Sequence, residues 1–143
     1  MHFNVLVVDD SAVMRSMITR VVRMCGVPLG EFYEAGNGAE GLRAVREHWV
    51  DLVLLDINMP VMNGEEMLRH LRADPETASL PVIVVSTESS ETRVHALEEL
   101  GVAFVHKPFA PETLRDTILR VTGVTPDEEH YAVPAGDGLD LDF

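Results

Sequence analysis

The sequence predicts an α/β domain: a doubly wound, five-stranded parallel sheet with helices on both faces. Short apolar runs alternate with amphipathic stretches of about 10 to 14 residues, which is typical of alternating strands and helices. The strand candidates are apolar on both faces, as expected where helices cover a parallel sheet on each side. Hydrophobic residues make up 46% of the 143 residues and charged residues 24%, a composition that excludes a chain disordered throughout.

The first half of the chain predicts three strands and two helices. The apolar run at 4–9 is the first strand, and Ser11 is a plausible N-cap for a helix at 12–25 that Gly26 ends. A less apolar second strand at 32–35 precedes a helix at 37–49, and 52–55 is an unbroken apolar strand. The residues of the second helix expected to face the core are Leu42, Ala44, Val45 and Trp49.

The second half predicts two more strands, at 81–85 and 102–105. A third helix at 63–73 ends at Asp74, because the residue before a proline avoids the helical region. The remaining helices are expected at 90–100 and 111–121, the latter opening on a proline suited to a first helical turn. We therefore place one domain at 1–123, followed by a tail at 124–143 that holds six acidic residues, several glycines and prolines, and no Lys or Arg.

Charge and composition exclude several classes of function. A formal net charge of −13 has the wrong sign for binding a phosphate backbone, so no nucleic-acid partner is expected. The longest apolar runs are far shorter than the roughly 20 residues of a bilayer span, so no membrane segment is expected. The single Cys25 forms no internal disulfide, which favours a cytoplasmic location.

Polar side chains follow four of the predicted strands. Asp9 and Asp10 follow the first, Asp56 the third, Ser86 the fourth, and Lys107, the only lysine beside ten arginines, the fifth. Carboxyl ends of parallel strands share one edge, and in the order 2-1-3-4-5 the three carboxylates would converge in one pocket. Taken singly, each of these residues could be an ordinary cap, turn former or loop lysine. Together they predict a site for a hard divalent cation, most simply Mg²⁺.

The residues at these strand ends carry a family resemblance. The stretches are Val5 to Ser11; Leu54 to Pro60 with Asn63 and Gly64; Val84 to Thr87; and Lys107 to Phe109. In order and spacing they resemble the receiver domain of two-component response regulators, over residues 4 to about 122. Asn58 and Glu88 resemble single-domain chemotaxis regulators in particular. The resemblance implies a flavodoxin-like strand order, 2-1-3-4-5.

The resemblance also implies a role for each site residue. Asp56 would accept a phosphoryl group from a histidine kinase or a histidine phosphotransfer protein, and Lys107 would pair with the phosphoryl oxygens. Asp9, Asp10, Asp56 and the backbone carbonyl of Asn58 would hold Mg²⁺. Ser86 and Phe104 would carry the conformational switch, and Asn58 and Glu88 would modulate dephosphorylation. Such a domain is not an enzyme in the usual sense, because it catalyses only its own Mg²⁺-dependent phosphorylation and dephosphorylation.

Three residues depart from the common family pattern. Ser86 stands in place of the commoner threonine, and Thr87 stands where a small residue is usual, which could slow access to Asp56. Phe104 replaces a switching tyrosine and has no hydroxyl to bond in either position; an ordinary core role is about equally supported.

Three functions remain in competition. The first is a stand-alone switch that signals by phosphorylation-dependent binding to a downstream protein, since no DNA-binding or catalytic domain follows residue 123. The second is a phosphate relay or sink without a dedicated output. The third is a nucleotide-binding enzyme, because Gly36, Gly38 and Gly41 match a G-x-G-x-x-G pattern that follows a strand and opens a helix.

The tail is expected either to be a solubilising segment or to pack on a receiver surface. We expect that surface to be the one formed by helix 90–100, strand 102–105 and helix 111–121, on the same chain or on a neighbouring copy, which would make the tail or those helices a dimer contact.

Overall fold

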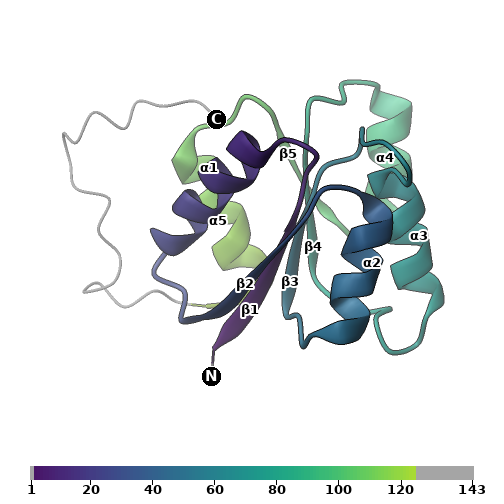
Figure 1. The fold of residues 1–143 in the computed structure, drawn as a ribbon. Helices are drawn as coiled ribbons and strands as arrows, with labels where there is room; N and C mark the ends of the chain where they lie inside the picture. The colour runs from purple at the N-terminus through teal and green to yellow at the C-terminus, as the bar shows by residue number, and fades with distance from the viewer. Residues whose placement is uncertain (1, 125–143) are drawn as a thin grey trace.

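The computed structural model describes residues 2–124 as a single five-stranded parallel sheet between two layers of helices (Figure 1). The strands are β1 (Phe3–Val8), β2 (Leu29–Ala35), β3 (Leu52–Leu55), β4 (Val82–Ser86) and β5 (Ala103–His106). The helices are α1 (Ala12–Arg23), α2 (Gly38–Glu47), α3 (Gly64–Ala73), α4 (Glu91–Glu98) and α5 (Pro111–Thr122). The strand order is β2-β1-β3-β4-β5, which confirms the predicted fold and order.

The two faces of the sheet have separate apolar cores because successive side chains of a strand point to opposite sides. Val5 and Val7 of β1 pack with α1 and α5, whereas Leu6 and Val8 pack with the layer of α2, α3 and α4. All four side chains are 0–1% exposed. Burial of such a side chain contributes roughly 1.5–3 kcal/mol, so these strands hold the domain together and fix the edge at which they end.

Side-chain caps fix the helix starts that lie nearest the carboxyl edge of the sheet. Ser11 accepts the backbone N–H of Met14 at the start of α1, as predicted. Asn63 and Glu66 form a capping box at the start of α3, in which each side chain bonds the other residue's backbone. These caps hold the loops after β1 and β3 in one arrangement.

The prediction that Trp49 faces the core is wrong. Helix α2 ends at Glu47, and the Trp49 side chain is 79% exposed in the loop before β3. Hydrogen bonds with neighbouring residues hold this loop: the Asn4 amide donates to the Trp49 carbonyl at 2.8 Å, and the indole N–H donates to Asp51 Oδ1 at 3.1 Å. These hydrogen bonds hold Trp49 in a loop, where the apolar pattern had predicted that α2 would continue.

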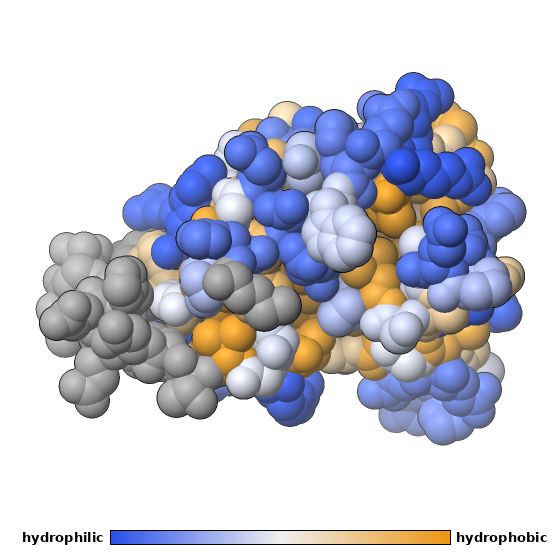
Figure 2. Space-filling model, turned by 90° about the horizontal axis from the view of Figure 1, so that it is seen from below, coloured by the Kyte–Doolittle hydropathy of each residue, from blue (hydrophilic) through white to orange (hydrophobic). Residues whose placement is uncertain are grey.

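The edge of the sheet at which the strands begin lies opposite the predicted site. Seen from that side, the surface is largely hydrophilic with small apolar areas between the polar side chains (Figure 2). No helix within residues 2–124 is both long enough and apolar enough to cross a bilayer.

Candidate functional site

Asp9 and Asp10 follow β1 in different environments. The Asp9 side chain is almost fully buried, and its Oδ1 accepts the backbone N–H of Ser11 at 2.9 Å. Asp10 is exposed. Since Ser11 is the residue that caps α1, neither carboxylate is needed as the N-cap, and both remain available at the sheet edge.

Asp56 completes a group of three carboxylates. It follows β3, which pairs directly with β1, and one oxygen from each of Asp9, Asp10 and Asp56 lies within 4.8 Å of the others. The Asp56 Oδ1 accepts the backbone N–H of Ile57 at 2.8 Å. The predicted convergence of the three carboxylates is therefore present in the structure.

Lys107 reaches this group from β5. Its Nζ lies 2.8 Å from Asp9 Oδ2 and 3.5 Å from Asp56 Oδ2. The side chains of Lys107 and Asp56 are each 11% exposed, so water screens these interactions little. The Lys107–Pro108 peptide bond is cis. The single lysine of the chain is thus placed between the two more buried carboxylates.

Burial raises the pKa of Asp56 above its usual value, and the nearby charge of Asp9 raises it further. The Lys107 ammonium and the hydrogen bond from Ile57 N–H act in the opposite direction. The pKa of Asp56 is raised overall, and the Lys107 charge offsets part of this rise in favour of the carboxylate form that a nucleophile or a metal ligand requires.

Ser86 and Glu88 lie at the neighbouring strand end. Ser86 is the last residue of β4 and fully buried, and its Oγ accepts the backbone N–H of Glu88 at 3.2 Å. Its carbonyl accepts the backbone N–H of Lys107 at 2.9 Å, which ties the end of β4 to the lysine. The Glu88 carboxylate is 3.9 Å from the guanidinium of Arg93 in α4. Thr87 is exposed.

Asn58 and Phe104 are the remaining predicted site residues. Asn58 is exposed in the loop between β3 and α3. Phe104 is half-buried against the core on the α2–α4 side, and its ring centroid is 4.5 Å from that of His106. In the loop between β3 and α3, Val61 has a φ of 68°, a conformation that β-branched residues rarely adopt.

The sequence analysis named Gly64 near the site but missed Arg15. Arg15 of α1 donates from Nη1 to the Asp9 carbonyl at 2.6 Å and from Nε to Glu34 at 2.9 Å. Gly64 is needed because a Cβ there would overlap the Asp56 carbonyl. A glycine at the start of a helix is a visible signal, but no pattern in the sequence pairs Arg15 with Asp9.

The glycine-rich turn before α2 has a packing role. The Gly38 N–H donates to the Met62 carbonyl at 2.8 Å, and a Cβ at Gly38 would lie 2.8 Å from that oxygen and 2.9 Å from the Asn63 carbonyl. The start of α2 is thus covered by the loop after β3, which argues against a dinucleotide diphosphate at this turn.

Comparisons with known proteins agree with this geometry. The profile of the response regulator receiver domain matches residues 5–119. The chain belongs to this family. The receiver domain is 36% identical over 115 residues to PilH of Pseudomonas aeruginosa (80% of this chain, 93% of PilH), and 30% identical over 121 residues to the chemotaxis protein CheY-3 of Vibrio cholerae (84% and 92%).

A solved structure of a chemotaxis response regulator has the same fold. The structure of the chemotaxis response regulator CheY4 of Vibrio cholerae matches with a TM-score of 0.74 and 32% identity, covering 85% of this chain and 99% of CheY4. The receiver domain described here is therefore of the chemotaxis, two-component type, and its acidic cluster is compatible with the magnesium site that receiver domains have.

Proposed function

We propose that this receiver domain is a switch that accepts a phosphoryl group on Asp56 and signals by binding a downstream protein in its phosphorylated form. The observation that carries the proposal is the convergence of three carboxylates with one buried ammonium at the carboxyl edge of the sheet. The relatives CheY-3 and PilH are themselves little longer than the matched region, which supports a single-domain mode of action. We place the switch in the cytoplasm, with a histidine kinase or a histidine phosphotransfer protein as donor.

The three carboxylates suit a magnesium ion. Ionised, they carry three negative charges against the one positive charge of Lys107, which leaves two uncompensated in a small, poorly screened volume. Mg²⁺ prefers oxygen ligands, commonly one or two carboxylates together with waters. Asp9, Asp10, Asp56 and the carbonyl of Asn58 would hold it, and it would supply positive charge near the reacting phosphoryl oxygens.

Asp56 acts as the nucleophile. One of its carboxylate oxygens attacks the phosphorus of a phosphohistidine, the new O–P bond forms as the N–P bond breaks, and the imidazole leaves with the electron pair and gains a proton from solvent. Water later attacks the same phosphorus and breaks the O–P bond, which releases inorganic phosphate and restores the carboxylate. Lys107, already 3.5 Å from Asp56 Oδ2, is placed to pair with phosphoryl oxygens.

Ser86 and Phe104 would convert the new charge into a change of surface. Ser86 Oγ accepts the Glu88 N–H, and its own hydroxyl hydrogen can turn toward a phosphoryl oxygen on Asp56. A shift of Ser86 would move the end of β4, which is in register with β5 through the Ser86–His106 and Val84–Phe104 pairs. The half-buried Phe104 ring could then move, while Asn58 and Glu88 at the rim would set the access of water.

Mass spectrometry of the intact protein tests the site assignment. With Mg²⁺ and acetyl phosphate or phosphoramidate, the wild-type chain should gain one phosphoryl group, and Asp56→Asn should gain none. Asp116→Asn removes an exposed carboxylate on α5 and should behave as wild type. Equal phosphorylation of the Asp56→Asn variant would overturn the proposal. A phosphorylated chain that binds no target yet passes its phosphoryl group to a histidine phosphotransfer protein would instead indicate a relay.

A further inference from the structure

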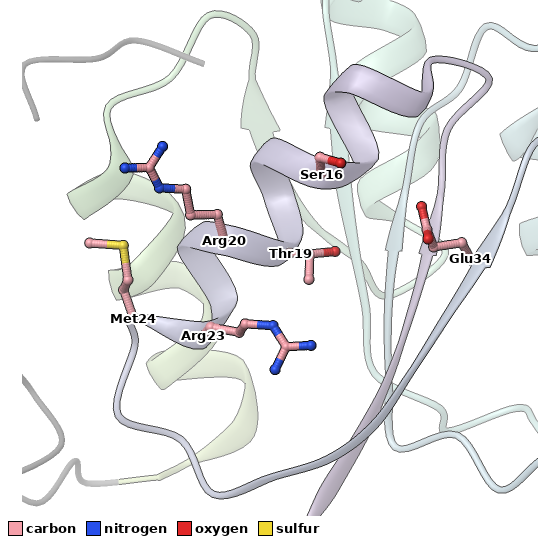
Figure 3. Close-up of a pocket in the computed structure, with 6 residues that line it drawn as sticks. All are labelled: Ser16, Thr19, Arg20, Arg23, Met24 and Glu34. Atoms are coloured by element: carbon pink, nitrogen blue, oxygen red, sulfur yellow. The ribbon is translucent and has the colours of Figure 1, made fainter.

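The second half of α1 presents two arginines whose charge nothing balances within residues 2–124. Arg20 and Arg23 are exposed, and neither makes an ion pair with a described residue. They line a shallow pocket of about 450 Å³ together with Ser16, Thr19, Met24 and Glu34 (Figure 3). We call the surface formed by these six residues the arginine face.

The arginine face keeps its positive charge because its one acidic residue is already paired. Glu34 accepts from Arg15 at 2.9 Å, on the side of the pocket toward β2. Arg23 lies with its guanidinium carbon 4.5 Å from the Phe32 ring centroid, a cation–π contact that holds the side chain without neutralising it. Arg20 leaves α1 in a different direction, so the two guanidinium groups spread over a wider surface (Figure 3).

A segment of opposite charge begins on the same side of the sheet as this surface. Residues 125–143 contain six Asp and Glu residues and no Lys or Arg. The last described residue, Val124, packs against the same apolar core as Val21 of α1 and Val27 just beyond it. Nineteen residues span up to about 60 Å when extended, far more than the distance along a helix of 12 residues. The segment can therefore reach every part of the arginine face.

The surface formed by α4 and β5 is less suitable for an acidic segment. The pocket on that side is lined by Glu91 and Glu98 in addition to His95 and His106. Acidic side chains brought to it would meet like charges, which disfavours binding. By contrast, Arg120 is exposed on α5, on the same face of the sheet as α1, and makes no ion pair within the described residues.

We propose that the acidic segment 125–143 docks on the arginine face of its own chain, with carboxylates placed around Arg20 and Arg23. Tethering raises the effective concentration of the segment, so individually weak, exposed charge pairs suffice. Docking closes the arginine face to other acidic partners, and it weakens with salt as the Debye length falls from about 8 Å near 0.15 M to about 3 Å at 1 M. The proposed docking surface is therefore on α1, rather than the surface of α4, β5 and α5 that was expected from the sequence.

A spin label on the segment can report where it docks. Ala135→Cys introduces a reactive thiol in the full chain, whereas the native Cys25 is fully buried and its raised pKa keeps it protonated. With the label attached, amide signals of residues 19–24 should broaden in nitrogen-15 spectra, and those of α4 should not. The broadening should disappear in the Arg20→Glu, Arg23→Glu double variant and at about 1 M salt.

The matched control lies on α2. Arg43 and Arg46 have the same spacing, are exposed, and make no ion pair within residues 2–124. The Arg43→Glu, Arg46→Glu variant should therefore keep the broadening on α1. Broadening on α4, no localised broadening, or equal loss in both double variants would each overturn the proposal. So would broadening seen only when labelled chains are mixed with separate isotope-enriched chains, because the segment would then dock on a second copy.

Discussion

Lys107 Nζ lies 2.8 Å from Asp9 Oδ2, and this ion pair is nearly closed to solvent, with side-chain exposures of 11% and 2%. The same nitrogen is 3.5 Å from Asp56, so without a phosphoryl group its closer partner is Asp9. A compact ammonium can serve both carboxylates from one position, whereas a planar guanidinium needs a wider space and fixed directions.

Lys107→Arg should therefore impair the switch although it preserves the charge. We expect Asp56 phosphorylation to continue with acetyl phosphate at a rate about 10-fold lower, because positioned positive charge contributes strongly to phosphoryl transfer. Phosphorylation-dependent changes in the amide spectra of Ser86 and Phe104 should be reduced. Arg93→Lys is the control, since the Arg93–Glu88 ion pair is partly exposed and, at 3.9 Å, longer than the Lys107–Asp9 pair. If the Lys107→Arg variant switches as fully as wild type, charge alone suffices.

Asp10→Ala should weaken magnesium binding without unfolding the domain. Asp10 is exposed, so its removal leaves no cavity, but one of the three converging carboxylates is lost. Millimolar MgCl₂ should raise the melting temperature of wild type through preferential binding to the folded state, and should raise that of the variant less. Glu47→Ala, at an exposed position on α2, should keep the full shift. Equal shifts in all three proteins would remove Asp10 from the metal site.

Gly38→Ala should destabilise the domain by about 1–3 kcal/mol, because the new Cβ would press on backbone oxygens that cannot move independently. These are the carbonyls of Met62 at 2.8 Å and Asn63 at 2.9 Å. At Gly36 the nearest atom to a new Cβ is a Glu40 side-chain oxygen at 3.4 Å, so Gly36→Ala should be close to neutral. Urea unfolding of the two variants measures the difference. Similar stabilities would mean that the loop after β3 adjusts freely.

Cys25 should make stability fall at high pH. Burial raises the pKa of its thiol from 9.0 to about 12, so between these values the unfolded chain loses a proton that the folded chain keeps. The contribution of the Cys25 thiol to the free energy of unfolding is fully present below pH 9 and is lost as pH rises toward 12. Comparing the pH dependence of unfolding in wild type and Cys25→Ala isolates it. Parallel curves for the two proteins above pH 9 would contradict the burial argument.

The sequence predicted the sheet well because short apolar runs have few alternatives to a buried parallel strand. All ten elements are present, and Asp9, Asp10, Asp56 and Lys107 converge because strand ends alone determine where those residues lie.

What the sequence could not supply depends on pairings between distant residues. Trp49 has an apolar side chain at helical spacing, yet Asn4, 45 positions earlier, bonds its carbonyl and draws it into a loop. Likewise, Arg15 of α1 bonds the Glu34 carboxylate of β2, 19 positions later. Neither contact leaves a periodic signal.

The exposure of Trp49 has a consequence for spectroscopy. This is the only tryptophan of the chain, and the residue is already 79% exposed to water in the folded protein. Its emission should be red-shifted before unfolding begins and should change little on denaturation. Helical circular dichroism, or a tryptophan introduced at Phe109, which is 3% exposed, would report the loss of structure that the native fluorophore does not detect.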